Sequence, residues 1–263
     1  MWIDFHTHAF PNKLGPITIK RLGEAAHLAP WTNGTLDGLK TIMEEDGVTL
    51  SVVHSIATKP SQQNNVNDFV LEINKDFSFV AFGTVHPDSE NAIEELERLH
   101  AAGIRGIKFH PEYQGFFPDD EKMKPLYQKI SSLGFVTLFH AGLDHGFPPP
   151  YHGLPERFAG MLSWVESPVV LAHWGALSMP EETLKYLCGL PVWFDTSFGY
   201  DTLSRDQALR ILDKHGIDKI VFASDLPWHR PKKELAYLQD LGLSADELET
   251  ICYRNGAKLL GIK

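Results

Sequence analysis

Short apolar runs rich in β-branched residues alternate with amphipathic stretches along the whole sequence, and this alternation limits the folds that the chain can adopt. Residues 91–102 show the helical pattern, because Ile93, Leu96 and Leu99 recur at helical spacing. Further helices are predicted at residues 122–133, 180–188 and 205–215. Strands are predicted at residues 2–6, 48–54, 78–85, 104–109, 135–140, 168–173, 191–195 and 218–223.

Eight strand–helix units in about 250 residues are typical of a (β/α)8 barrel, the TIM barrel. Gly103, Gly134 and Gly216 each follow a predicted helix, where a left-handed residue commonly ends the helix. The segment 244–260 adds helices after the eighth unit. A doubly wound open sheet is the alternative, but it usually has fewer strands and a less even repeat. We therefore expect an α/β fold, a (β/α)8 barrel with extra C-terminal helices.

The domain organisation is expected to be simple. No Pro/Gly/Ser-rich linker, charge block or low-complexity stretch divides the 263 residues. A chain of this length can bury one large core. We predict a single barrel domain over residues 1–263.

Charge and composition bear mainly on partners and localisation. The chain has 24 basic and 34 acidic residues and a formal net charge of -10, which argues against nucleic acid and against an anionic membrane surface. We expect no signal peptide, because the N-terminus carries Asp4 and lacks a basic region. No apolar run approaches the ~20 residues that a membrane span needs. Cys188 and Cys252 imply no disulfide framework, so a cytoplasmic protein is predicted.

Potential metal ligands follow the predicted strands. His6 and His8 lie two residues apart at the end of the first strand, so they share a face and could chelate one cation. In such barrels the active site lies at the carboxyl ends of the strands. Every predicted strand ends in His or Asp, namely His6 with His8, then His54, His86, His110, His140, His173, Asp195 and Asp225. A convergent metal site explains this pattern better than chance does.

Five segments carry a family resemblance, namely Asp4–His8, Phe139–Gly142, Leu171–Gly175, Phe222–Trp228 and Arg254–Gly261. In this order they resemble motifs of the amidohydrolase superfamily. The most similar branch is the amidohydrolase-related one, which includes aminocarboxymuconate-semialdehyde decarboxylase and dicarboxylate lactonases. The resemblance runs the full length of the chain. It implies a divalent metal ion, with zinc as the first choice, and a small-molecule substrate.

Carried over residue by residue, the resemblance implies His6, His8, His140 and Asp225 as ligands of one divalent ion. It leaves His173 as an acid/base or as the residue that polarises the acyl oxygen, while Asp225 also handles the proton of the attacking water. The donor chemistry agrees, because three nitrogens and one carboxylate suit Zn²⁺ with a position open for water. A buried core histidine is the alternative for His140, and a structural role is the alternative for His173.

Lys108 departs from the pattern of the one-metal members of this branch, which do not require a lysine on the fourth strand. Two-metal relatives use such a lysine in carbamylated form to bridge two ions. Lys108 and His110 share a strand face, so both are expected to point into the mouth of the barrel. We rank contact with a substrate anion first, a bridging ligand of a second ion next, and a structural salt bridge last.

Other polar residues near the strand ends are weaker candidates. Arg230 follows the last strand and could bind a substrate carboxylate bidentately, or be an ordinary surface arginine. His54 and His86 could line the mouth or support the ligands from behind. Asp195 is expected to be a hydrogen-bonding residue of the barrel rather than a ligand.

Histidines away from the strand ends are not expected at the site. The segment 142–155 is predicted to be a stiff loop over the mouth, where selectivity would reside. His27, His100 and His215 fall in helical patterns and are predicted to face solvent.

The leading hypothesis for function is a metal-dependent hydrolase that cleaves an amide, ester or lactone bond of a small molecule with a metal-activated water. A non-oxidative decarboxylase with the same ligands is the alternative, in which Lys108 or Arg230 would hold the departing carboxylate. A metal-dependent deoxyribonuclease is disfavoured by the net charge, and a non-catalytic ligand-binding barrel by the intact ligand set. A homodimer is left open, and the fold does not identify the substrate.

Overall fold

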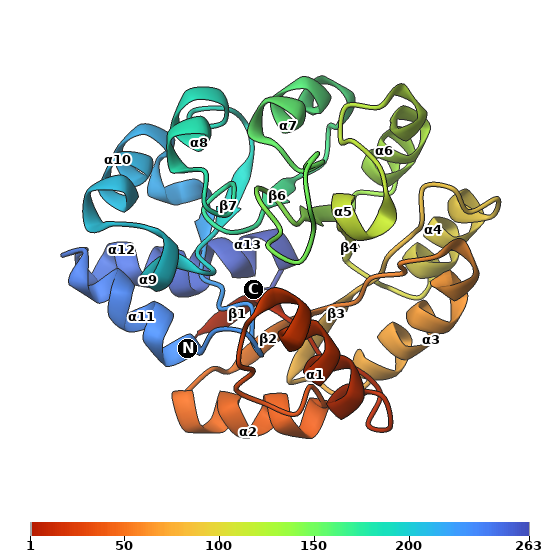
Figure 1. Cartoon of the computed structure of the whole chain (residues 1–263), viewed down its shortest axis with the longest axis horizontal. Coiled ribbons are helices and arrows are strands. Elements are labelled where there is room, and N and C mark those ends of the chain that lie inside the picture. The colour runs from red at the N-terminus through yellow and green to blue at the C-terminus, as the bar shows by residue number, and fades with distance from the viewer. Residues whose placement is uncertain (1, 263) are drawn as a thin grey trace.

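The strands of the protein form a parallel ring that follows the eightfold alternation of the sequence (Figure 1). The structure is a computed structural model that describes residues 2–262, so residues 1 and 263 of the predicted domain lie outside the described residues. The strands are β1 (Ile3–Thr7), β2 (Leu50–His54), β3 (Phe79–Phe82), β4 (Gly106–Phe109), β5 (Val136–Phe139), β6 (Val169–Leu171), β7 (Trp193–Asp195) and β8 (Ile220–Val221). Each overlaps one strand that the sequence predicts.

The ladder of hydrogen bonds consists of two parallel sheets that are joined at both edges. One sheet has the order β1-β2-β3 and the other the order β4-β5-β6-β7-β8. Between β3 and β4, Gly83 accepts a hydrogen bond from Lys108 N and donates one to Gly106 O. Between β8 and β1, Phe5 N donates to Phe222 O and Asp225 N donates to His6 O. The chain therefore adopts the (β/α)8 barrel, and the open-sheet alternative is wrong.

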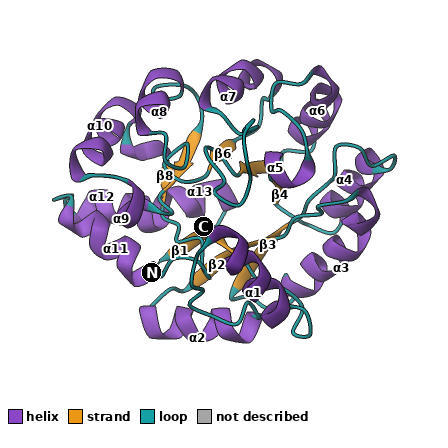
Figure 2. Cartoon of the chain, in the orientation of Figure 1, coloured by secondary structure: helices purple, strands orange, loops and turns teal. Residues whose placement is uncertain are grey.

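Most of the helices form an outer layer around the strands (Figure 2). The helices of the chain are α1 (Gly15–Ala26), α2 (Leu36–Asp46), α3 (Gln63–Ile73), α4 (Ala92–Ala101), α5 (Pro111–Gln114), α6 (Lys124–Ser132), α7 (Pro155–Met161), α8 (Pro180–Tyr186), α9 (Gly199–Thr202), α10 (Arg205–His215), α11 (Pro231–Asp240), α12 (Ala245–Glu249) and α13 (Asn255–Leu260). Short 3-10 turns cover Pro60–Gln62, Glu121–Met123, Leu162–Trp164 and Ile217–Lys219, and a π-helical turn covers Thr250–Arg254. Within residues 2–262 we find no helix both long and apolar enough to cross a bilayer.

The interior of the barrel is an apolar core that α13 closes from the amino ends of the strands. Phe5, Val52 and Leu138 belong to this core, and Ala257 and Leu260 of α13 pack with it. A second apolar layer fills the space between the strands and the outer helices. Because the amino end is packed in this way, the polar side chains at the carboxyl ends of the strands face the opposite opening, which α1 partly covers (Figure 1).

One histidine that was predicted to face solvent is buried. The ring of His215 stacks on Phe194 with centroids 3.9 Å apart, and its Nδ1 accepts a hydrogen bond from Gly189 N. The prediction was wrong because His215 continues the buried stripe of α10 that includes Ala208 and Ile211, at a spacing that the helical pattern already contained. His27 and His100 are exposed, as expected.

Candidate active site at the carboxyl ends of the strands

A cavity of about 370 Å³ lies at the carboxyl ends of the strands. The predicted ligands and their neighbours share one trait, since each lies at or just beyond a strand end and lines this cavity. They are His6, His8, Lys108, His110, His140, His173 and Asp225. The architecture thus brings together residues that are up to 219 positions apart in the sequence, from His6 to Asp225.

Two imidazoles from β1 converge on the carboxylate that follows β8. The distance from Asp225 Oδ1 to His8 Nε2 is 2.9 Å, and the distance to His6 Nε2 is 3.5 Å. The rings of His6 and His8 are tilted by 65° with centroids 5.1 Å apart. The shared strand face of the His-x-His pair and the closure of β8 onto β1 produce this convergence.

The hydrogen bonds of the two imidazoles determine which nitrogens carry protons. His6 Nδ1 lies 2.8 Å from Asp195 Oδ2, and His8 Nδ1 lies 2.9 Å from the carbonyl oxygen of His54. Both partners are acceptors, so both Nδ1 atoms donate. Burial lowers the pKa of His6 well below its ordinary value, so that ring is neutral.

In the neutral ring of His6 the Nε2 lone pair therefore faces both Asp225 Oδ1 and the Lys108 ammonium, which lies 3.1 Å away, and His8 Nε2 approaches the same carboxylate oxygen. Asp225 Oδ1 is buried and accepts no hydrogen bond from residues 2–262. Facing lone pairs repel unless a cation lies between them, and neutral imidazole nitrogens whose other nitrogen is hydrogen-bonded are the usual metal ligands. The donor set His6, His8 and Asp225 fits a divalent cation.

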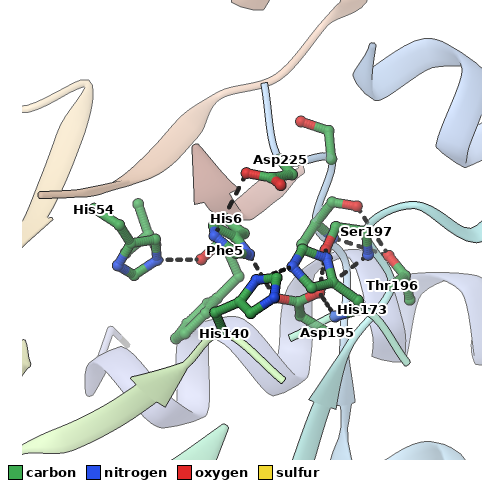
Figure 3. A network of polar contacts seen from close by, with 12 residues as sticks. Phe5, His6, His54, His140, His173, Asp195, Thr196, Ser197 and Asp225 are labelled. Carbon is green, nitrogen blue, oxygen red and sulfur yellow. Dashed lines mark hydrogen bonds and ion pairs between the residues drawn. The ribbon is translucent and has the colours of Figure 1, made fainter. Parts of the chain in front are cut away.

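A chain of hydrogen bonds crosses the cavity wall from β7 to β5 (Figure 3). Ser197 Oγ donates to Asp195 Oδ1 at 2.5 Å, so His173 Nδ1 must donate to Ser197 Oγ at 2.8 Å. His173 Nε2 then accepts from His140 Nδ1 at 3.1 Å. His140 Nε2 consequently carries a lone pair, and it is buried without a partner among the described residues. Burial lowers the pKa of both rings, so His140 also has the protonation state of a ligand.

The surroundings of His140 differ from those of the β1 pair. Its ring stacks on His110 with centroids 4.2 Å apart and planes at 7°. His110 Nε2 lies 3.3 Å from Asp144 Oδ2, in the loop that follows β5. A cation bound by an imidazole lies in the plane of the ring, and two parallel stacked planes do not share such a point. In this arrangement His110 and His140 do not chelate one ion together.

Lys108 points into the same cavity, as the alternation of the strand predicts. Its Nζ lies 3.1 Å from His6 Nε2, and its side chain is about 1% exposed. Burial lowers the pKa of Lys108 to about 8, against the opposing effect of the charges of Asp225 and Asp195. The hydrogen-bond partner of Nζ is an imidazole rather than a carboxylate, which does not fit the structural salt bridge.

The backbone is strained where these side chains are placed. His173 and Asp225 have φ values of 61° and 63°, in the left-handed region that costs a non-glycine residue about 1–3 kcal/mol. Beside Asp225, Ser224 donates from its backbone N at 2.9 Å and from Oγ at 2.5 Å to the buried Asp4 carboxylate. Burial raises the pKa of Asp4 to about 7. This contact holds the β1–β8 junction and with it the position of Asp225.

The substrate contact predicted for Arg230 does not fit its position. Its guanidinium is bidentate on Asp46 of α2, at 2.8 Å from Nη2 and 3.0 Å from Nε, and Nη2 is 2.6 Å from Glu45. Arg230 is not among the residues that line the cavity within the described chain. The physical reason is that α11 packs on α2, whose acidic end captures the guanidinium.

The weaker candidates His54, His86 and Asp195 differ in whether they line the cavity. His54 lines the cavity and its Nε2 donates to the Phe5 carbonyl at 2.9 Å. His86 accepts from Asp88 N and is not among the described residues that line the cavity. The carboxylate of Asp195 orients His6 and accepts a hydrogen bond from the backbone N of His173. These contacts agree with the predicted hydrogen-bonding role.

Sequence reasoning missed several residues that shape the cavity. His229 lines it, with Nδ1 2.8 Å from Glu234 and Nε2 3.3 Å from Asp201. Phe198 also lines it, as do Asp144 and His145 of the loop that was predicted to overhang the mouth. His229 is adjacent to Arg230, so the segment carried a signal, and the residue of this pair that lines the cavity is His229.

Comparisons with known proteins agree with this architecture. The family model described as Amidohydrolase matches residues 3–262, whereas a search of curated proteins gave no significant match. An uncharacterised TIM-barrel protein from Bordetella bronchiseptica is similar in structure, with a TM-score of 0.80, 17% identity and coverage of 99% of this chain and 98% of that one.

Two further structures carry activities in their names. 5-Carboxyvanillate decarboxylase from Sphingomonas paucimobilis has a TM-score of 0.74 and 14% identity, and covers 100% of this chain and 99% of its own. A probable 2-pyrone-4,6-dicarboxylic acid hydrolase from Acinetobacter baumannii has a TM-score of 0.71 and 18% identity, with 99% of both chains covered. At these identities the structural similarity establishes the fold alone.

Proposed function

Because the chain belongs to the amidohydrolase family, we propose that it is a metal-dependent hydrolase that cleaves an amide, ester or lactone bond of a small molecule. The observation that carries this proposal is the approach of His6 Nε2 and His8 Nε2 to the same carboxylate oxygen, Asp225 Oδ1. These three atoms are arranged as ligands of a cation. A bound cation would activate a water molecule for attack on an acyl carbon, which is the chemistry of a hydrolase.

The residues proposed to hold the ion are His6, His8, Asp225 and His140. Three nitrogens and one oxygen favour Zn²⁺ over harder ions such as Mg²⁺. When bound, the ion supplies a Lewis acid that lowers the pKa of a water in the site and polarises a carbonyl oxygen. The free lone pair on the buried Nε2 of His140 supports its inclusion as the fourth ligand.

The remaining residues have roles that follow from their contacts. Asp225 has a carboxylate that can accept the proton of the attacking water. His173 has its Nδ1 proton engaged by Ser197, so Nε2 is the atom that can exchange the hydrogen bond from His140 for one with the substrate or leaving group. Lys108 is positively charged below a pH near its lowered pKa of about 8, so it can orient a carboxylate or acyl oxygen.

A decarboxylase is the second candidate, and Lys108 is the observation that favours it. Its buried ammonium beside His6 could grip the carboxylate that departs. The proposal is weaker than hydrolysis because Arg230, the other cation considered for this role, is paired with Asp46 and Glu45. The two similar structures named above include one activity of each kind.

Metal analysis of the purified protein is the first test. We expect about one equivalent of divalent metal per chain in the wild type, and loss of that metal in His140→Ala. His86→Ala is the matched control, because this histidine also follows a strand but does not belong to the described lining of the cavity. Full metal in His140→Ala would remove this residue from the ligand set.

The second test separates the reactions with a screen of lactones, amides, esters and aromatic acids in H₂¹⁸O. Hydrolysis incorporates ¹⁸O into the product acid. Release of carbon dioxide with no ¹⁸O in the organic product would establish the lyase instead.

A further inference from the structure

The lining of the cavity includes a group of apolar side chains, in contrast to the polar cluster at the strand ends. We call it the apolar wall, and it consists of Phe10, Ile19, Leu22, Leu28, Phe198 and Trp228. Two of these side chains come from α1, which partly covers the opening of the barrel near β2 and β3 (Figure 1). The polar cluster of His6, His8 and Asp225 lines the same cavity, so one small molecule can contact both.

Helix α1 turns an uncharged stripe towards the cavity. Thr18, Ile19, Leu22 and Ala26 line it, at spacings that place them on one face of the helix. The basic residues of α1 lie elsewhere, since Lys20 and Arg21 are both exposed. The sequence of this helix therefore places its cations in solvent and its apolar face against whatever occupies the cavity.

The charged residues of the lining also favour an uncharged group at the apolar wall. Among the described residues that line the cavity, Lys108 is the only lysine or arginine, and it lies beside His6. Asp144 and Asp201 add negative charge to the lining. A substrate carboxylate placed against the apolar wall would lose its hydration without gaining a cation, which is unfavourable. The lysine of the lining thus lies at the polar end, and the apolar wall offers no lysine or arginine to a second anionic group.

Phe198 belongs to the apolar wall and also contacts His173, at the polar end of the cavity. Its ring meets His173 edge-on, with centroids 5.3 Å apart and planes at 90°, and packs on His229 at 3.9 Å. Glu234 fixes His229 by a 2.8 Å contact to Nδ1, so this aromatic surface is held in place. Apolar surface therefore begins next to His173, where the group attached to a reacting acyl carbon would lie.

We propose that the apolar wall binds an uncharged apolar or aromatic group, so that the site selects substrates with a single acyl or carboxylate group and discriminates against dicarboxylates. The assignment of the acyl group to the polar end rests on the function proposed above. The selectivity itself is a property of binding and is measurable without turnover.

Isothermal titration of the purified, metal-containing protein with two matched probes tests this selectivity. 3-Phenylpropanoate has one carboxylate and an apolar ring, whereas glutarate has a second carboxylate in place of the ring. Burial of a phenyl group predicts that 3-phenylpropanoate binds at least about tenfold more tightly than glutarate. Equal affinities, tighter binding of glutarate, or no measurable binding of 3-phenylpropanoate would overturn the proposal.

Two arginine substitutions on α1 make the test specific to the apolar wall. Leu22→Arg places a cation in the lining and should shrink the preference for 3-phenylpropanoate by about tenfold or more. Ile17→Arg is the matched control, because Ile17 lies on the same helix but is 70% exposed, and it should leave the ratio unchanged. An unchanged affinity ratio in Leu22→Arg would contradict the proposal. If the arginine variant does not fold, Leu22→Ala replaces it, and the affinity for 3-phenylpropanoate should then fall several-fold.

The outcome is separable from that of the proposed function. Selective binding of 3-phenylpropanoate without ¹⁸O incorporation into any tested ester, amide or lactone would refute the hydrolase while leaving the apolar wall as the binding site. Hydrolysis of dicarboxylate substrates in preference to monocarboxylate ones would refute the selectivity while leaving the hydrolase.

Discussion

Of the three groups of imidazoles and carboxylates that lie close together among the described residues, two belong wholly to the cavity lining, and these two differ in geometry. His6, His8 and Asp225 place one ligand atom each within 4.8 Å of one another, and so do His110, His140 and Asp144. In the first cluster the rings are tilted by 65°, whereas in the second they are stacked at 7°. Proximity alone therefore does not distinguish a metal site from a stacked pair.

The two clusters also differ in the hydrogen bonds that their imidazole nitrogens make. Asp195 and the His54 carbonyl engage the Nδ1 protons of His6 and His8, so Nε2 is the nitrogen that each ring turns towards Asp225. In the second cluster His110 Nε2 meets Asp144 directly at 3.3 Å. The comparison teaches that distant hydrogen-bond partners set the tautomers, and with them the nitrogen atoms that each group of residues can offer to a cation. We infer that His140 joins the first cluster rather than completing the second.

Removal of the shared carboxylate should have the largest effect. Asp225→Ala leaves His6 and His8 without the oxygen that both approach, so metal affinity should fall by more than about 100-fold, beyond the loss typical of an outer residue. Turnover of any substrate found should be lost with it. Metal affinity is measured by competition with a chelator, with His86→Ala as control. Retention of wild-type affinity in Asp225→Ala would eliminate the first cluster as the metal site.

His173→Ala should separate turnover from metal binding. Loss of a positioned acid/base costs about 10²–10⁴-fold in rate. The metal should largely remain, because His173 contacts His140 Nδ1 rather than offering a free nitrogen of its own. Rate constants and metal content are measured on the same preparation. Complete loss of metal would make His173 a ligand, and full activity would make it structural.

Asp195→Asn tests the role of the tautomer in the first cluster. Asp195 Oδ1 accepts from the backbone N of His173 and of Ser197, so an asparagine would direct its amide N–H towards His6 Nδ1. That would force the proton onto His6 Nε2 and remove its lone pair. We expect metal affinity to fall by about 10–100-fold with the fold intact, as followed by chelator competition and thermal unfolding. An affinity within twofold of the wild type would show that the tautomer is set elsewhere.

Asp144→Asn should have the smallest effect, because the second cluster is not expected to hold an ion. The change removes the charge beside His110 but leaves His6, His8 and Asp225 untouched. We expect metal stoichiometry to be unchanged and turnover to vary by less than about threefold, in the range of a partly exposed ion pair. Loss of one of two bound ions would instead assign a metal to this cluster.

Much of the first cluster could be predicted from the sequence, for physical reasons. Residues two apart on a strand share a face, which pairs His6 with His8. Closure of the barrel then brings the residue after β8 beside β1, which adds Asp225. The same logic correctly placed Lys108 and His110 in the cavity, since alternate residues of β4 point inwards. These inferences need only the local periodicity and the order of the strands.

The parts that the sequence did not predict depend on contacts between distant segments. Arg230 pairs with Asp46, 184 residues earlier, because two outer helices pack together. The stacking of His110 on His140 and the apolar stripe of α1 depend on how loops cross the mouth. Periodicity gives no information on such crossings, so the identity of the side chains around the ligands could not be derived.

Diffraction from crystals of the metal-loaded protein, with anomalous data at the absorption edge of the metal, shows directly which cluster holds the ion. We predict one anomalous peak at about 2.0–2.2 Å from His6 Nε2, His8 Nε2 and Asp225 Oδ1, with His140 Nε2 turned to the same ion. A peak between His110 and Asp144, with none at the first cluster, would show that the second cluster is the metal site.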